Sequence, residues 1–584
     1  MLILLDPDLL PPERRQVLLA FLRKPFTDDS CALIEAELPA LGPAYRAMAA
    51  QRPLGKSLGT TQAAQADAVL RPVAELNGRT LPLPSGVLLQ AQVILLEEVV
   101  RDELEWLQRS GAASRLGPCT PAEARLAVQA ASLHEAAFLT LARLFELRPQ
   151  GRLIAFALTP LGKECVRNRV ATTTMQHHTE AAMRAVMLDT IDQLRRQASR
   201  RIDSIAARLT PTLVDSYASW LLDAGFSLSS SMQGDPKVKP LIVKARKLCR
   251  WLVVLDIVRL AGEHDMACDA ALLQQLGLDI TLMEEILAIQ ASELSSDQGV
   301  YRTARGGLTL GGASLTHALN CCKHAVLSGD DAQKLGKPFE SHVRSYVEQA
   351  VPPNDYLVRR WVQSGSNGKG RNYDCDLILF EPKRRKLFFV QTKWKRDGRT
   401  ATLEDELKNW RAKTGPLTYG VGQLTGLRER LSEPGVLGQV RDALGSIEMS
   451  DREIQENAHF IVLHTLPYFS AYTIDGVTIY EWNLFRNLLL RGATQRAAIG
   501  RGGNALGRMS TVASSELLPL EDPEQVIAHF FRAAGDPAQL LPQAMDHRLG
   551  ARYGFDIVLP GATPWQRALR KLRPARVRIV RPYI

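Results

Sequence analysis

An aspartate, a glutamine and a lysine interrupt two apolar segments in the second half of the chain. The stretch YDCDLILFEPKRRKLFFVQTKWKRDG, residues 373–398, is typical of two strands joined by the turn PKRR. Because side chains on a strand alternate between its two faces, Gln391 and Lys393 are expected to point the same way. Asp376 begins the partner strand, so a hairpin of this length predicts that all three side chains meet at one end of a sheet.

One carboxylate, one amide oxygen and one ammonium group suit a divalent cation with a water molecule beside it. Hard cations such as Mg²⁺ prefer oxygen ligands and keep several waters. A lysine alongside can orient or help to deprotonate the attacking water and offset the charge of a phosphate. The pattern predicts a hydrolytic site with Mg²⁺ or Mn²⁺ as its cofactor. The alternative is an ordinary hairpin in which Asp376 caps a turn and Lys393 is a solvated edge residue.

The spacing of these residues resembles that of the PD-(D/E)XK nuclease superfamily, in the QxK variant of its Mrr-type restriction endonuclease branch. The resemblance covers residues 335–490, and its parts come in the family's order. They are a first helix GKPFESHVRSYVEQAV with Glu340, strands in DYLVRRWVQS, CDLILFE and FFVQTKW, a helical region, the strand AHFIVLHTL, and a closing strand and helix in IDGVTIYEWNLFRNLLL. Gln391 departs from the carboxylate that is commoner in the superfamily, which lowers the negative charge of the site, and Asp374 is an alternate ligand.

The resemblance implies an α/β nuclease domain, with a central mixed sheet flanked by helices, and a Mg²⁺-dependent endodeoxyribonuclease activity. It implies that Asp376 binds the metal, that Gln391 and Glu340 complete its shell, and that Lys393 positions the water. It also implies restriction or antiviral defence, with two active sites for duplex cleavage and hence a homodimer or a partner subunit. Two alternatives stay open: a catalytically weak or inactive DNA-binding or assembly subunit, and a structure-specific repair nuclease or RNase on the same fold.

Basic residues cluster around the hairpin and across the chain. The formal net charge of +10 and the pI of about 9.2 favour a polyanionic partner, although a solvated basic surface is the alternative. Phosphate contacts position a duplex without reading its sequence. The residues predicted to contact DNA are Lys383, Arg384, Arg385, Lys395 and Arg396.

A chain of 584 residues is too long for one ordinary core, and its patterns predict a multidomain protein with an α-rich N-terminal half. The predicted regions are a helical N-terminal region at 1–115, a helical region at 116–328 with candidate winged-helix modules and a long helix, the Mrr-like nuclease domain at 329–491, and a linker and basic C-terminal extension at 492–584.

Two segments have the order of a winged helix-turn-helix, whose second helix enters the major groove of DNA. The first comprises helices between Thr120 and Leu147 and a strand in residues 152–164. The second comprises two helices in residues 268–290, divided near Gly277, and a hairpin in residues 299–312. A helix pair that closes on a hairpin is also common in cores. The long helix, residues 172–209, is expected either to dimerise as a coiled coil or to pack on its own domain.

Several classes of protein are disfavoured by the sequence. The eight cysteines include no CxxC pair, which indicates a reducing, cytoplasmic compartment rather than a zinc site or a disulfide framework. The N-terminus lacks a basic segment typical of a signal peptide, and polar residues interrupt the most apolar segment, 86–100, so no membrane partner is expected. No nucleotide-binding motif is present, so any ATP dependence requires a helicase or ATPase partner.

Overall fold

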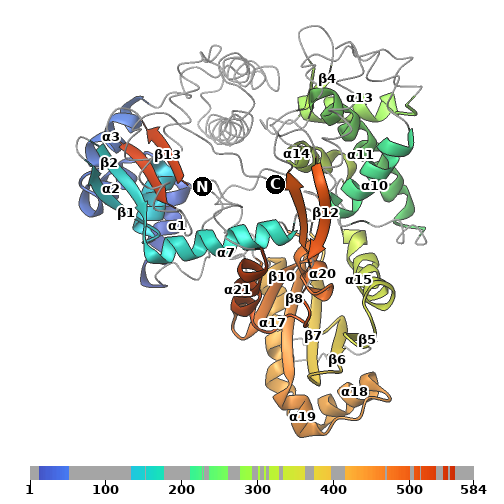
Figure 1. The fold of residues 1–584 in the computed structure, drawn as a ribbon. Coiled ribbons are helices and arrows are strands. Elements are labelled where there is room, and N and C mark those ends of the chain that lie inside the picture. Colours follow the sequence, from blue (N-terminus) through green and yellow to red (C-terminus); the bar gives the residue numbers. More distant parts are fainter. Residues whose placement is uncertain are drawn as a thin grey trace.

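The computed structural model is a mixed α/β structure (Figure 1). Its buried hydrophobic residues form separate clusters. It describes residues 12–51, 133–150, 153–176, 211–226, 228, 236–260, 276–292, 300–302, 308–310, 315–327, 333–361, 374–395, 415–466, 470–492, 494–499, 506–512, 514–534, 544–549 and 553–558.

A six-stranded mixed sheet forms the centre of residues 333–492, in agreement with the sheet predicted there. Its strand order is β5-β6-β7-β8-β10-β9. Neighbouring strands are antiparallel from β5 to β7, parallel from β7 through β8 to β10, and antiparallel between β10 and β9. The strands are β5 (Leu357–Arg360), β6 (Leu377–Glu381), β7 (Lys386–Lys393), β8 (Ala458–His464), β9 (Tyr472–Ile474) and β10 (Val477–Glu481).

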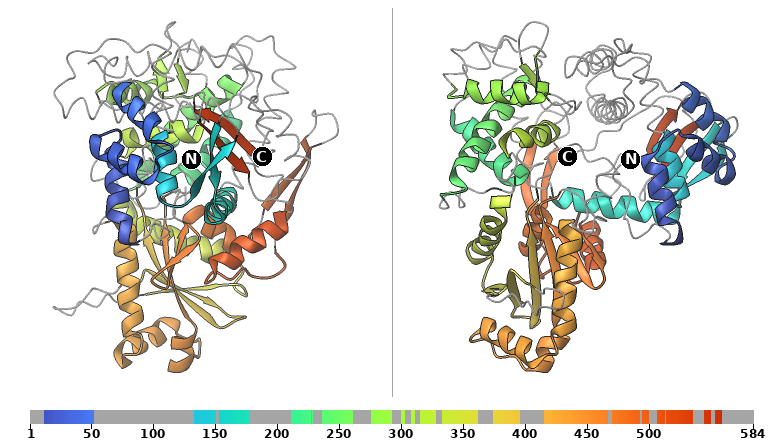
Figure 2. Two further views of the ribbon diagram at one scale, coloured as in Figure 1. Left: turned by 90° about the vertical axis from the view of Figure 1, so that its left-hand side faces the viewer. Right: turned by 180° about the vertical axis from the view of Figure 1, so that it is seen from behind.

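Helices cover both faces of this sheet, which explains why its inner strands are nearly continuous apolar runs (Figure 2). One face packs on α15 (Gly336–Ala350), α20 (Trp482–Leu489) and α21 (Pro523–Ala534), and a 3₁₀ turn, η6 (Gln333–Leu335), precedes α15. The other face packs on α17 (Pro416–Arg430), α18 (Pro434–Leu444) and α19 (Asp451–Glu456). Each helix therefore presents one apolar side to the sheet.

A second group of helices precedes the sheet in the sequence and has its own hydrophobic core. It contains α10 (Pro211–Phe226), α11 (Lys239–Leu260), α13 (Ile280–Ser292), α14 (Leu315–Val326) and the hairpin of β3 (Val300–Arg302) and β4 (Leu308–Leu310). The turn at Gly277 has a φ of +64°, and the following helix and hairpin occur as predicted. The first helix of that winged-helix candidate lies outside the described residues, and the hairpin packs back on α11.

The N-terminal unit combines segments from both ends of the chain (Figure 1). It contains η2 (Pro12–Arg14), α1 (Arg15–Arg23), α2 (Asp28–Glu37), α3 (Gly42–Gln51), a helix over residues 133–141, β1 (Phe145–Gln150) and β2 (Leu153–Leu158). The strands β13 (Ala544–Leu549) and β14 (Tyr553–Val558) complete its sheet, with order β1-β2-β14-β13 and β14 parallel to β2.

The C-terminal region, residues 492–584, which was predicted as a linker and a basic extension with a helix near residues 522–535, contains regular structure. Besides α21 and the β13–β14 pair, it holds the antiparallel pair β11 (Thr494–Ile499) and β12 (Leu506–Val512). The helix α7 (Pro160–Gln176) runs from the N-terminal unit to α20 and α21 (Figure 1). The rest of the long helix predicted for residues 172–209, with its coiled-coil seam, lies outside the described residues. No helix in the described ranges combines the length and the apolar character that crossing a bilayer requires.

His134 predicts an acid-sensitive N-terminal unit. Its Nδ1 lies 2.6 Å from the Tyr45 hydroxyl and its Nε2 lies 3.2 Å from the carbonyl oxygen of Leu22, an arrangement that the neutral ring satisfies. Burial lowers the pKa of His134 to about 4. Between the ordinary pKa of about 6.5 and this value, the unfolded chain binds a proton that the folded chain does not, so stability falls as the pH falls.

Acidification from pH 6.5 to pH 5 should therefore lower the free energy of opening of this unit by about 2 kcal/mol. Hydrogen exchange by mass spectrometry, corrected for the intrinsic pH dependence, would measure it in peptides from residues 15–51, with α17 peptides as internal control. In His134→Gln, which keeps a donor and an acceptor, this pH dependence should disappear. An equal pH response in the variant would show that another group is responsible.

Candidate active site

The pairing of β6 with β7 brings the predicted site residues together. Leu377 lies opposite Val390, and the backbone N–H of Asp376 continues the ladder by donating to the Val390 carbonyl oxygen at 3.0 Å. Strand alternation then places Asp376, Gln391 and Lys393 on the sheet face that α17 covers, in line with buried neighbours such as Phe389. The hairpin predicted from the sequence is confirmed, and its polar residues converge at one end.

The carboxylate of Asp376 is held through one of its two oxygens. Its Oδ2 accepts hydrogen bonds from Gln391 Nε2 at 2.8 Å, from the Thr392 backbone N–H at 2.6 Å and from the Thr392 hydroxyl at 2.7 Å. None of these donors reaches Oδ1. Burial raises the pKa of Asp376, and the bonds from Thr392 and the charge of Lys393 oppose that rise.

The amide oxygen of Gln391 is the second oxygen available at this site. The residue is 2% exposed, and its Oε1 has no hydrogen-bond partner among the described residues. A buried polar atom without a partner costs about 1–3 kcal/mol, so such atoms are rare in native cores. The amide N–H of Gln391 donates to Asp376 Oδ2. The Gln391 Oε1 and the Asp376 Oδ1 therefore remain as oxygen ligands of the kind that hard cations prefer.

Lys393 is fixed from α17. Its Nζ donates to Gln423 Oε1 at 2.8 Å, and Gln423 Nε2 in turn donates to Asp374 Oδ2 at 3.4 Å. The same Nζ lies 5.3 Å from the ring centroid of Tyr419. A Cβ atom at Gly420 would come within 3.3 Å of Lys393 Cε, so the glycine lets the helix approach the strand this closely. Burial lowers the pKa of Lys393, and the neighbouring carboxylates oppose that shift.

Glu340, on α15, interacts electrostatically with Asp376 and Lys393. Burial raises its pKa to about 7, and repulsion by Asp376 adds to the rise while the charge of Lys393 opposes it. Such a perturbed carboxyl group is typical of functional sites, although structural carboxylates also show it. Within the described part of the chain, no group of three His, Cys, Asp or Glu side chains could hold a metal by itself. The predicted ligand set therefore depends on the amide oxygen of Gln391.

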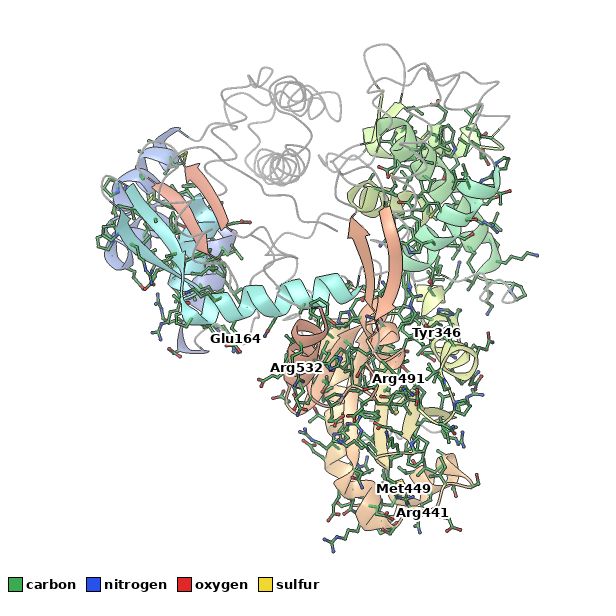
Figure 3. All side chains as sticks on the ribbon, in the orientation of Figure 1. Glu164, Tyr346, Arg441, Met449, Arg491 and Arg532 are labelled. Atoms are coloured by element: carbon green, nitrogen blue, oxygen red, sulfur yellow. The ribbon has the colours of Figure 1, made fainter. Side chains whose placement is uncertain are left out.

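Most of the predicted DNA-contact residues lie away from this site. Lys383, Arg384 and Arg385 are in the β6–β7 turn, at the opposite end of the hairpin from Asp376. Arg385 donates to the Glu448 carbonyl oxygen at 2.7 Å and forms an ion pair with Glu453. Glu448 adjoins Met449, which Figure 3 labels near one end of the sheet region.

Arg384 is engaged as well, because it forms an ion pair with the fully buried Glu381. Lys395 follows β7 on the side of the candidate site, and Arg396 lies outside the described residues. Of the four basic residues that the structure describes, Lys395 is the one that lies close to Lys393 in sequence and space, and DNA contact by all five stays a prediction.

Sequence reasoning missed three side chains of the site. Thr392 holds Asp376, and Gln423 and Tyr419 contact Lys393. Thr392 lies between two predicted residues, and strand alternation alone would place its side chain on the opposite strand face. Gln423 and Tyr419 are one helical turn apart on α17. The available sequence signal was a glutamine within the segment GVGQLTGL, and in the structure this glutamine is 6% exposed.

The chain matches no protein-family model, and no curated protein or solved structure matches it. The resemblance to Mrr-type nucleases thus stays a prediction that rests on the order and spacing of sequence motifs.

Proposed function

We propose that the chain is a metal-dependent endonuclease that hydrolyses phosphodiester bonds in DNA at the site formed by Asp376, Gln391, Lys393 and Glu340. The observation that carries this proposal is the buried and unpartnered Gln391 Oε1 beside the Asp376 carboxylate and the Lys393 ammonium group. Buried polar atoms without a partner are uncommon in native proteins, and this one belongs to a side chain that donates to the Asp376 carboxylate.

The oxygen donors present fit a hard divalent cation such as Mg²⁺ or Mn²⁺. Asp376 through Oδ1, Gln391 through Oε1 and the Glu340 carboxylate would hold it. When bound, such an ion supplies a Lewis acid for the phosphate and makes a coordinated water more acidic.

The chain's own residues supply orientation and charge. Thr392 holds Asp376 by two hydrogen bonds to Oδ2, which leaves Oδ1 to the ligand. Gln423 fixes the Lys393 ammonium group, whose positive charge stabilises negative charge on a phosphate or orients an attacking water. The positions of these groups are set before substrate arrives, which is the usual source of electrostatic catalysis.

The cellular role that fits this activity is restriction or antiviral defence in the cytoplasm. Cleavage of both strands of a duplex requires two such sites, and therefore a homodimer or a partner subunit. A helicase or ATPase partner would account for any ATP dependence. Structure-specific repair and RNA cleavage are activities of the same chemistry on other substrates, and comparison of duplex, branched and RNA substrates separates them.

A second function is favoured by one observation, the neutral Gln391 in place of a carboxylate ligand. Lower negative charge weakens cation binding. A chain whose site no longer retains a metal would act as a DNA-binding or assembly subunit on the same fold. The nuclease proposal and this alternative differ in whether cleavage depends on Asp376.

Plasmid cleavage by the purified chain in Mg²⁺, Mn²⁺ or EDTA tests the proposal. The substitution Asp376→Asn should lower the cleavage rate by about 10²-fold or more, because a metal-ligand oxygen loses its charge. The matched control is Asp442→Asn, the same change at an exposed position of α18, which should leave the rate unchanged. Metal-dependent cleavage that is equal in both variants would contradict the assigned site, and metal-free binding of DNA without cleavage would favour the assembly subunit.

A further inference from the structure

Tyr419 is an exposed aromatic side chain at the edge of the candidate site. It is 52% exposed, and the other exposed large hydrophobic residues of the described ranges are the aliphatic Val17, Val243 and Ile280. Apolar side chains are usually buried, and an isolated exposed one needs no explanation by itself. The position of this one, in the first turn of α17, makes it different.

The ring lies directly beside the group assigned to catalysis. Lys393 Nζ is 5.3 Å from its centroid, and Gln423, which holds the same ammonium group, lies one helical turn further along the same side of α17. Gly420 brings this part of the helix against the strand, since a Cβ atom there would be 3.2 Å from Val462 Cγ2 and 3.3 Å from Lys393 Cε. The exposed Tyr419 ring therefore lies at the surface beside Lys393.

Packing does not account for the ring. Its neighbours Leu417 and Val421 belong to the buried cluster between α17 and the sheet, but Tyr419 does not. Its hydroxyl makes no hydrogen bond to the described residues, whereas the Tyr45 hydroxyl, in the N-terminal unit, is buried and bonded. A cation–π contact at an exposed site contributes about 0.5–1 kcal/mol. Such a contact requires one ring face only, and it leaves the rest of the ring accessible.

We propose that Tyr419 stacks on an unpaired base next to the phosphate that Lys393 contacts, so that the preferred substrate is DNA with a single-stranded or splayed segment at the cut. This inference rests on the proposed function. A phosphodiester placed at Lys393 carries its nucleoside within reach of the Tyr419 ring. An exposed aromatic face beside a cation is the arrangement that binds single strands without sequence preference. Bases in an intact duplex are stacked on each other and do not offer a free face.

Binding of oligonucleotides in EDTA, where no cleavage occurs, tests the stacking directly. The probes are a single-stranded deoxyoligonucleotide containing 2-aminopurine and the duplex of the same sequence. Tyr419→Ala should weaken binding of the single strand by about 5- to 100-fold and should abolish the quenching of 2-aminopurine. Binding of the duplex should change little. Tyr419→Phe and Tyr419→Trp should retain both the affinity and the quenching, because each keeps an aromatic face.

The matched control is Gly422→Ala, in the same helix, where an added Cβ meets nothing within 4 Å. It should bind both probes as the unmodified chain does. Equal loss of single-strand and duplex binding in Tyr419→Ala, or no loss at all, would overturn the inference.

The cleavage assay with the same variants separates this inference from the proposed function. Single-strand binding that depends on Tyr419 in a chain that never cleaves DNA would support the stacking and contradict the nuclease. Cleavage that depends on Asp376 but is identical in Tyr419→Ala, at low and at saturating substrate, would support the nuclease and contradict the stacking.

Discussion

Lys393→Ala is expected to lower the rate of DNA cleavage at saturating substrate by about 10²- to 10⁴-fold. Among the described residues, Lys393 is the only one whose cationic group forms a hydrogen bond with α17 at this site. Its Nζ donates to Gln423 Oε1 at 2.8 Å. Alanine removes that charge from the site. Single-turnover kinetics with plasmid or oligonucleotide substrate in Mg²⁺ would measure the loss.

The matched control for this experiment is Lys383→Ala, which removes the same charge from the exposed turn at the other end of the same hairpin. If Lys383 contacts DNA, its loss should weaken binding and leave the rate at saturation unchanged. An unchanged rate in Lys393→Ala would mean that the β6–β7 hairpin has only a structural role.

Arg384→Met is expected to destabilise the sheet region by about 3 kcal/mol, near the lower end of the range for breaking a buried ion pair. The Glu381 side chain is 0% exposed, and it accepts hydrogen bonds from Arg384 Nε at 2.5 Å and from Nη2 at 2.6 Å. Methionine would leave this carboxylate in the core without its bidentate partner. The lower end of the range applies because the Arg384 side chain is itself 31% exposed and water can reach the pair.

A loss of this size corresponds to a fall of roughly 6–12 °C in the midpoint of thermal unfolding for a region of this length. Calorimetry on the full chain would measure it. The neighbouring change Arg385→Met is the control, because Arg385 and its partner Glu453 are 48% and 40% exposed and such pairs contribute about 0–1 kcal/mol. The double change Glu381→Gln and Arg384→Met should recover part of the loss.

The same pair of variants also tests the DNA contacts predicted for the β6–β7 turn. Since Arg384 is engaged with Glu381 and Glu521, its removal should affect stability more than DNA affinity. A large loss of affinity without a change in the unfolding midpoint would instead support DNA binding by this turn.

The amino-acid sequence by itself determined the β6–β7 hairpin and the meeting of Asp376, Gln391 and Lys393. Two apolar runs separated by a turn can pair in one main way, and strand alternation then decides which side chains share a face. The predicted order of helices and strands in residues 335–490 is also present, because each of these elements has its own local apolar pattern.

Only the tertiary structure decided which residues surround these groups. Gln423 and Tyr419 reach Lys393 because α17 crosses β7 at Gly420, and the packing of a helix on a sheet depends on contacts between residues far apart in the sequence. For the same reason β14 could not be assigned to the N-terminal sheet, where it lies beside β2. A local sequence pattern specifies a helix or strand and its apolar face. Which elements pack against that face depends on the complementarity of whole surfaces, and no short segment contains that information.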